Sequence, residues 1–106
     1  MSKPVPIPKR LAQARKAVGI SQKELGIRLG MEPGSASGRM NHYEKGRHTP
    51  DYQTLERIAL ELGVPVSFLT CRSDLSAELY CLIEKLGDEE KRTLISQIKD
   101  NLSAKS

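Results

Sequence analysis

A chain of 106 residues can hold one compact domain and a short appendage, and its few aromatic residues (three Tyr, one Phe, no Trp) leave aliphatic side chains to build the core. No apolar run approaches the roughly 18 residues that span a bilayer, and the proline-rich start lacks the apolar segment of a signal peptide, so we expect a cytoplasmic protein with no membrane contact. Residues 1–50 carry ten Lys or Arg against three Asp or Glu (net +7), whereas residues 51–106 carry seven against ten (net −3), which indicates either a nucleic-acid contact or a solvated basic face in the first half.

Proline and glycine residues divide the first 70 positions into an arm and five helices. Residues 1–8 are expected to form an extended arm, because Pro4, Pro6 and Pro8 fix φ and keep the preceding residues out of the helical region. Pro8 also suits the first position of a helix. The predicted helices lie near residues 8–18, 22–29, 35–45, 52–62 and 66–69.

Two further helices follow Cys71. Ser73 or Asp74 is expected to cap the first, which Gly87 ends, and Asp88 is expected to cap the second. Each helix carries a narrow apolar stripe, formed by Leu75, Leu79, Leu82, Ile83 and Leu86 in the first and by Leu94, Ile95, Ile98 and Leu102 in the second. No segment alternates with the period of a strand. The predicted fold is therefore all-α, with a five-helix domain over residues 9–70 and a C-terminal helical hairpin over residues 73–102.

The third predicted helix has one apolar and one polar face. Its apolar residues Ala36, Met40 and Tyr43 recur at helical spacing. The polar face presents Ser37, Gly38, Asn41, His42 and Lys45, with Arg39 at the boundary. Together with the short helix before it and the glycine turn between them, this pattern is typical of a helix-turn-helix, whose second helix enters the major groove of DNA.

Residues 10–69 resemble the Xre/Cro/cI-type helix-turn-helix domain of phage repressors. The matching segments are Leu11-Ala12-Gln13-Ala14-Arg15, Gly19-Ile20-Ser21-Gln22-Lys23-Glu24-Leu25, Leu29-Gly30, Tyr43-Glu44-Lys45-Gly46-Arg47, Thr49-Pro50, Leu55-Glu56-Arg57-Ile58-Ala59 and Leu62-Gly63-Val64. The resemblance implies a repressor-like five-helix domain that binds double-stranded DNA, and with it a transcriptional repressor.

The chain departs from the family pattern between the two helices of the motif. Gly30 and Glu44 are fourteen positions apart, where the family has about ten. The insertion, placed at residues 32–35, either lengthens the turn or starts the recognition helix one turn earlier. Gly26 stands where the family usually has Ala, and we expect either residue to permit close helix packing.

The resemblance assigns DNA contacts to individual positions. The residues whose counterparts face the bases are Ser37, Gly38, Arg39, Asn41 and His42. Asn41 is the strongest candidate among them, because asparagine can pair with adenine through two hydrogen bonds, as arginine does with guanine. The candidates for phosphate contacts are Gln22, Lys23, Lys45, Arg47 and His48. Gln22 would bond a phosphate or brace the recognition helix, or be a plain surface residue. Arg39 and Asn41 could likewise be merely solvated.

Two further features bear on how the domain is held on DNA. By the same resemblance, Arg15 and Glu44 form a partly buried ion pair that orients the first helix against the end of the third. The arm, with Lys3, Lys9 and Arg10, either adds backbone or minor-groove contacts or is an unstructured leader.

The C-terminal stripes are expected to form a homodimer interface, because repressors of this type read two half-sites as two-fold dimers. The residues assigned to it are Leu75, Leu79, Leu82, Leu94, Ile98 and Leu102. The alternative is that the two helices only cap the core of a monomer.

No catalytic constellation, phosphate-binding loop or cofactor motif is apparent, so we do not expect an enzyme. Cys71 and Cys81 lack metal-ligand spacing and are expected to be free thiols, and His42 and His48 have no third ligand for a metal. The main alternative function is an antitoxin or adaptor that uses the helix-turn-helix fold to bind a protein partner, such as a toxin or an anti-repressor.

Overall fold

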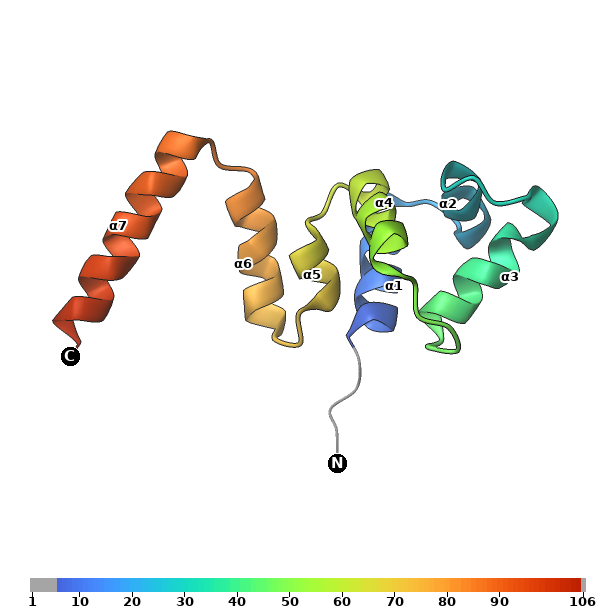
Figure 1. Cartoon of the computed structure of the whole chain (residues 1–106), viewed down its shortest axis with the longest axis horizontal. Coiled ribbons are helices and arrows are strands. Elements are labelled where there is room, and N and C mark those ends of the chain that lie inside the picture. Colours follow the sequence, from blue (N-terminus) through green and yellow to red (C-terminus); the bar gives the residue numbers. More distant parts are fainter. Residues whose placement is uncertain (1–5, 106) are drawn as a thin grey trace, which may run out of the picture.

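The computed structural model describes residues 6–105, which form seven α-helices and no strand (Figure 1). The expected all-α fold is confirmed. The helices are α1 (Ile7–Val18), α2 (Gln22–Arg28), α3 (Pro33–Glu44), α4 (Tyr52–Leu62), α5 (Val66–Thr70), α6 (Asp74–Glu84) and α7 (Asp88–Ala104). None of the helices in the described part is both long and apolar enough to cross a membrane.

Helix α3 begins two residues earlier than the predicted Ser35, at Pro33. Proline is favoured at the first position of a helix, because its φ is already helical and the amide proton that it lacks would have no partner there. The four extra residues of the chain are thus absorbed largely by an earlier helix start, one of the two alternatives that the spacing allowed. Met31 and Glu32 remain as a short link behind Gly30, whose φ of +92° makes the turn.

One other helix end differs from the prediction, and a second decides between two alternatives that the prediction left open. Helix α7 is capped by Gly87 and not by Asp88, which is its first helical residue. The Glu90 carboxylate accepts a hydrogen bond from the Gly87 amide at 3.0 Å, which is the half of a capping box that a glycine can still make. At α6 the choice between two caps falls on Ser73, whose hydroxyl accepts a hydrogen bond from the Ser76 amide.

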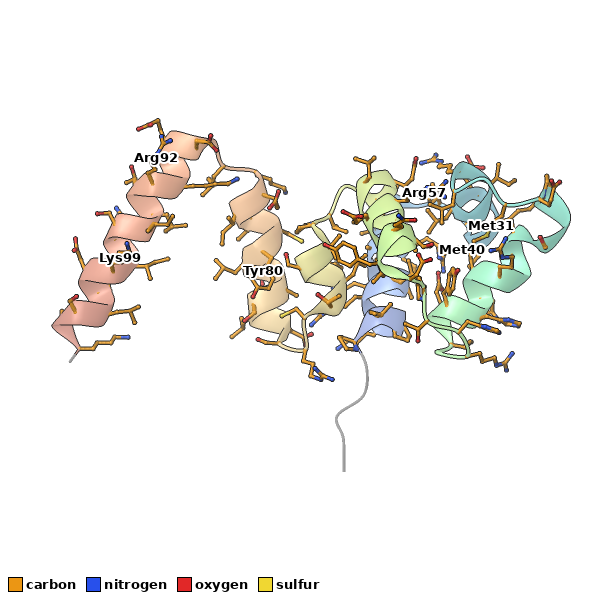
Figure 2. The ribbon with its side chains drawn as sticks, in the orientation of Figure 1. Met31, Met40, Arg57, Tyr80, Arg92 and Lys99 are labelled. Carbon is orange, nitrogen blue, oxygen red and sulfur yellow. The ribbon has the colours of Figure 1, made fainter. Side chains whose placement is uncertain are left out.

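One aliphatic core joins α1 to α5 and the inner side of α6. The largest side chains with no exposure to solvent are Leu11, Leu25, Met40, Ile58 and Leu69, so each of the first five helices contributes one. Figure 2 shows Met31 and Met40 within this part of the molecule. The core therefore fixes the recognition helix through Met40.

Helices α2 and α3 make the most extensive contact of any helix pair in the described part of the chain. Gly26 on α2 faces Ala36 on α3, and a Cβ atom built on Gly26 would lie 2.7 Å from the Ala36 Cβ. The expectation that Ala would serve equally well at position 26 is therefore wrong for this chain, because its methyl group would force the helices apart. The C-terminus of α2 is held in addition by Arg57 on α4, whose guanidinium donates to the Leu29 carbonyl.

The two C-terminal helices diverge in the single chain. Helix α6 packs on α5 and buries Ala77, whereas α7 stands apart from the rest and has no buried residue (Figure 1). Figure 2 shows Arg92 and Lys99 on this outlying helix. The result is an elongated molecule of 56 × 37 × 22 Å. Large apolar side chains of these helices are exposed, namely Leu75, Leu79, Tyr80, Leu82, Ile95, Ile98 and Leu102.

Candidate nucleic-acid interface

Helix α3 turns its apolar residues inward and its polar residues to solvent. Ala36 and Met40 are fully buried, and Tyr43 packs against the core. On the other side, Ser37, Gly38, Arg39 and Lys45 are exposed, and Asn41 and His42 are half-buried. No atom lies within 4 Å of a Cβ built on Gly38, so the face is open there. The candidate base-reading residues therefore share an accessible surface.

The end of α3 is tied to α1 by a bidentate ion pair. Arg15 donates from Nε to Glu44 Oε2 at 2.6 Å and from Nη2 to Oε1 at 3.1 Å, and its Nη1 also bonds the Ile20 carbonyl at 2.8 Å. The Arg15 and Glu44 side chains are only 12% and 6% exposed. The hydrogen bond to Glu44 raises the pKa of Arg15 above its usual value, so the guanidinium stays charged. A planar fork held at three points orients the helix more firmly than a single contact would.

Gln22 extends this network to the exposed face of α3. Its Nε2 donates to Glu44 Oε1 at 3.1 Å and to Asn41 Oδ1 at 3.3 Å. The Glu44 carboxylate can only accept hydrogen bonds, so the Gln22 amide must face it with its NH2 group. The Asn41 carbonyl is then turned toward α2. Gln22 thus braces the recognition helix in the free protein, and this contact also orients the residue assigned to base reading.

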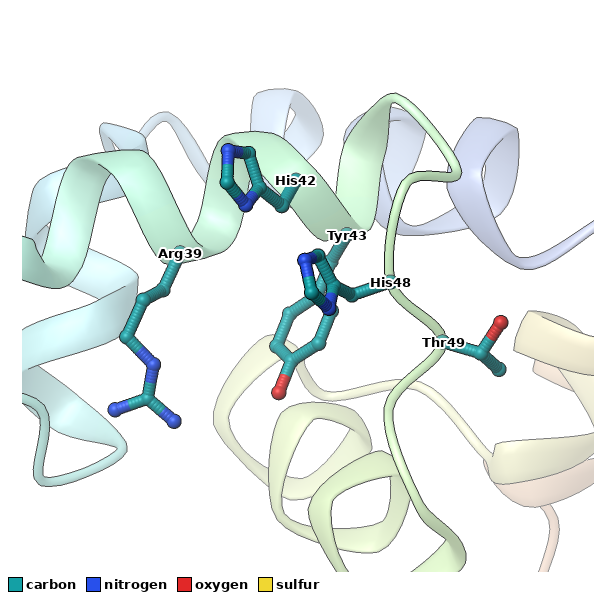
Figure 3. A pocket seen from close by; sticks show the side chains of 5 residues that line it. All are labelled: Arg39, His42, Tyr43, His48 and Thr49. Carbon is teal, nitrogen blue, oxygen red and sulfur yellow. The ribbon is translucent and has the colours of Figure 1, made fainter.

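A hollow of about 260 Å³ lies beside the C-terminal half of α3 (Figure 3). It is lined by Arg39, His42, Tyr43, His48 and Thr49. The rings of His42 and His48 stack with their centroids 5.1 Å apart and their planes 10° apart. In Figure 3 the Arg39 side chain extends from α3 across from the stacked rings. The hollow therefore groups two candidate base contacts, Arg39 and His42, with one candidate phosphate contact, His48.

Comparison with known proteins agrees with this geometry. A sequence model of the helix-turn-helix family matches residues 11–69, which is more than half of the chain. The chain belongs to the Xre/cI-type helix-turn-helix family. In solved structures it is similar to the transcriptional regulator BswR, with 42% identity and a TM-score of 0.87 over 94% of this chain and 99% of that one. A transcriptional regulator from Listeria innocua shares the fold at 20% identity, with a TM-score of 0.54 and 96% of each chain covered. No curated protein sequence matches the chain.

Within the helix-turn-helix domain, the candidate phosphate-binding residues lie around the recognition helix. Lys23 at the start of α2 is exposed, as are Lys45, Arg47 and His48 behind α3. Gln22 points inward to Asn41 and Glu44 instead. Because Gln22 bonds the last turn of α3, the start of α2 and the residues behind Glu44 lie near the same, C-terminal end of α3.

The N-terminal arm differs from its prediction. Lys9 and Arg10 belong to α1, which begins at Ile7 with Pro6 as its N-cap, and Lys3 lies outside the described residues. Arg10 is buried, with 2% exposure, and bonds the junction of α5 and α6. The expectation that Arg10 reaches DNA is therefore wrong. Neither this buried arginine nor the contact of Arg57 with α2 was predicted, because both join segments that are far apart in the sequence.

Proposed function

We propose that this protein is a transcriptional regulator that binds double-stranded DNA in a sequence-specific manner, and that it represses by occupying an inverted-repeat operator as a homodimer. The observation that carries the proposal is the state of α3 in the free chain. Its inner face is locked by Met40 and by the Arg15–Glu44 pair, while its polar face is open. A helix that is held in advance loses little conformational freedom on entering the major groove, which favours affinity.

Base reading is assigned to Asn41 and Arg39, with Ser37, Gly38 and His42 beside them. Arginine donates two hydrogen bonds to guanine, and asparagine pairs in the same way with adenine. Lys23, Lys45, Arg47 and His48 bind phosphates and set the register without reading sequence. The net charge of +7 over residues 1–50 strengthens association with DNA in general.

The homodimer proposal is supported by the two faces of α6. Ala77 lies against the chain's own core, with 1% exposure, while Leu75 and Leu82 on the opposite side are 80% and 52% exposed. At 100° per residue, these leucines are roughly half a turn away from Ala77. These exposed apolar side chains lie along one face of α6, and α7 exposes Ile98 and Leu102 as well. Such a surface can pack against the same surface of a second chain.

The experiment begins with selection of bound sequences from random duplex DNA, followed by affinity measured against salt concentration. Recovery of an inverted repeat, with log K falling steeply as log salt rises, supports the proposal. No enrichment, together with weak binding at physiological salt, would contradict it. In that case the exposed leucines favour the second candidate function, an antitoxin or adaptor that binds a protein partner, and capture of partners by residues 73–102 becomes the next measurement.

The first prediction separates base readers from phosphate binders. Asn41→Ala should lower affinity for the selected site by about 1–3 kcal/mol and relax preference at one base position. Its matched control is Lys45→Ala on the same helix end, which should weaken binding uniformly across sequences and reduce the salt slope by about 1. Equal behaviour of the two variants on matched and mismatched sites would argue against Asn41 as a reader.

A further inference from the structure

Helix α6 is the element through which the DNA-binding domain connects to the proposed dimer surface. It packs on α5 through the side that carries Ala77, and Cys81 also lies against the core. Burial raises the pKa of the Cys81 thiol, in keeping with that position. Its opposite side carries the exposed leucines. The angle between the recognition helix and the dimer surface therefore depends on how firmly the start of α6 is fixed to the domain.

Arg10 fixes that start. From the first turn of α1, its Nε donates to the Cys71 carbonyl at 3.0 Å and its Nη2 to the Arg72 carbonyl at 3.5 Å. The same Nη2 lies 2.9 Å from the Asp74 carboxylate, on the first residue of α6. The guanidinium also lies 5.5 Å from the centre of the Phe68 ring on α5. One side chain thus contacts the end of α5, the connecting segment and the start of α6.

The burial of Arg10 distinguishes it from its neighbour. The Arg10 side chain is 3% exposed, whereas that of Lys9, which also bonds Asp74 at 3.4 Å, is 70% exposed. The hydrogen bond from Arg10, and after it the charge of Lys9, hold the pKa of Asp74 below its usual range, so the carboxylate is ionised at neutral pH. A buried guanidinium with several acceptors restricts geometry more than an exposed ion pair does, because any tilt of α6 would strand a charge away from water.

We infer that Arg10 is a positioning residue that sets the angle between the DNA-binding domain and α6, and thereby the spacing of the two half-sites that the dimer accepts. The inference rests on the proposed dimeric reading of DNA. Each added base pair moves a half-site by about 3.4 Å and rotates it by about 35° about the duplex axis. A rigid junction cannot follow that change, so the dimer should discriminate between spacers. A loosened junction should accept several spacers and lose the affinity that preorganisation provides.

The test compares full-length wild type with Arg10→Met, which keeps an unbranched stem and removes every donor. Each test duplex carries two selected half-sites in inverted orientation. The spacer between them has the selected length, or is one or two base pairs longer or shorter. A further duplex carries a single half-site. Wild type should bind the selected spacer roughly tenfold more tightly than its neighbours. In Arg10→Met this ratio should fall to about threefold or less. Affinity for the single half-site, and the dimer mass in analytical ultracentrifugation, should not change.

Two further variants complete the test. Lys9→Gln removes the exposed charge next to Asp74 and should keep the spacer preference of wild type. Asp74→Asn removes the charge that Arg10 faces, keeps its two carbonyl contacts, and should give an intermediate preference. If Arg10→Met fails to fold, the spacer preferences of Asp74→Asn and Lys9→Gln still test the inference. Equal spacer preferences in these two variants would overturn it.

Other outcomes also overturn the inference. Arg10→Met with an unchanged spacer preference, even with a lower melting temperature or weaker half-site binding, would show that Arg10 only stabilises the fold. A dimeric wild type that is indifferent to spacing would overturn the inference alone. Failure of the proposed function looks different, since wild type itself would then be monomeric and would bind the paired site no more tightly than the single half-site. That result would remove the dimer proposal, and the positioning role of Arg10 with it.

Discussion

At the scale of single residues, substitutions in the polar network of Arg15, Gln22 and Glu44 should have the largest effects on stability. Glu44 accepts from both Arg15 and Gln22. Glu44→Ala leaves a guanidinium with little exposure and no carboxylate, so we expect it to lower the free energy of unfolding by about 3 kcal/mol. Urea unfolding followed by circular dichroism at a fixed protein concentration measures the loss.

A matched control lies on the neighbouring helix. Glu24 pairs with Arg28 at 3.3 Å, but these side chains are 48% and 39% exposed. Glu24→Ala should therefore cost less than about 1 kcal/mol. Equal losses in the two variants would mean that the Arg15–Glu44 pair acts as an ordinary surface pair.

Whether a side-chain contact could be predicted from sequence depended on how far apart its two residues lie along the chain. The Arg15–Glu44 contact was expected only because a family resemblance supplied it. Local rules favour Ser and Asp at the start of a helix, and the Ser21 and Asp51 side chains indeed accept hydrogen bonds from the amides of Glu24 and Thr54. Arg10 illustrates the opposite case. Its acceptors lie 61 and 62 positions away, and no local pattern encodes such a distance.

At the scale of elements, the tight contact between α2 and α3 predicts an unusual response to alanine. In an open helix Gly→Ala gains about 1 kcal/mol. At Gly26 the new Cβ would lie 2.7 Å from the Ala36 Cβ and 3.0 Å from its carbonyl oxygen. Overpacking should outweigh the gain, and Gly26→Ala should lose about 1–2 kcal/mol of stability in the same unfolding assay.

Two further variants define that prediction. Gly38→Ala meets no atom within 4 Å and should be stabilising. Adding Ala36→Gly to Gly26→Ala removes the nearest atom and should recover part of the loss, because the backbone contacts remain. A stabilised Gly26→Ala variant would show instead that the helices separate without cost.

Element identity followed from sequence more reliably than element ends. All seven helices were predicted, because glycines, prolines and apolar spacing act locally. The start of α3 could not be decided, since the same inserted residues fit a longer turn or an earlier helix. For α6 and α7 the sequence predicted a helical hairpin, whereas the two helices diverge in the structure, because an apolar stripe indicates burial without naming the surface that it packs against.

At the scale of the whole molecule, the exposed stripe of α6 predicts how the protein associates. Leu79, which is 49% exposed, should lie in the dimer interface. Leu79→Glu should leave the domain folded but place a charge between subunits, giving a monomer at tens of micromolar in analytical ultracentrifugation and weaker binding to the inverted repeat. The control is Leu60→Glu on α4, a leucine that is 82% exposed and lies outside the stripe. A dimeric Leu79→Glu variant would contradict the assignment.

The exposure of helix α7 affects how fast the protein should be degraded in the cell. Its 17 residues bury no side chain in the single chain, and most helices in proteins owe their stability to tertiary packing. In the single chain residues 88–104 are therefore accessible to proteases, and the proposed homodimer would supply the packing that they lack. If the proposed dimer covers this helix, cleavage should slow as protein concentration rises. A regulator built in this way is degraded fastest when it is scarce, so its level should drop abruptly once synthesis stops.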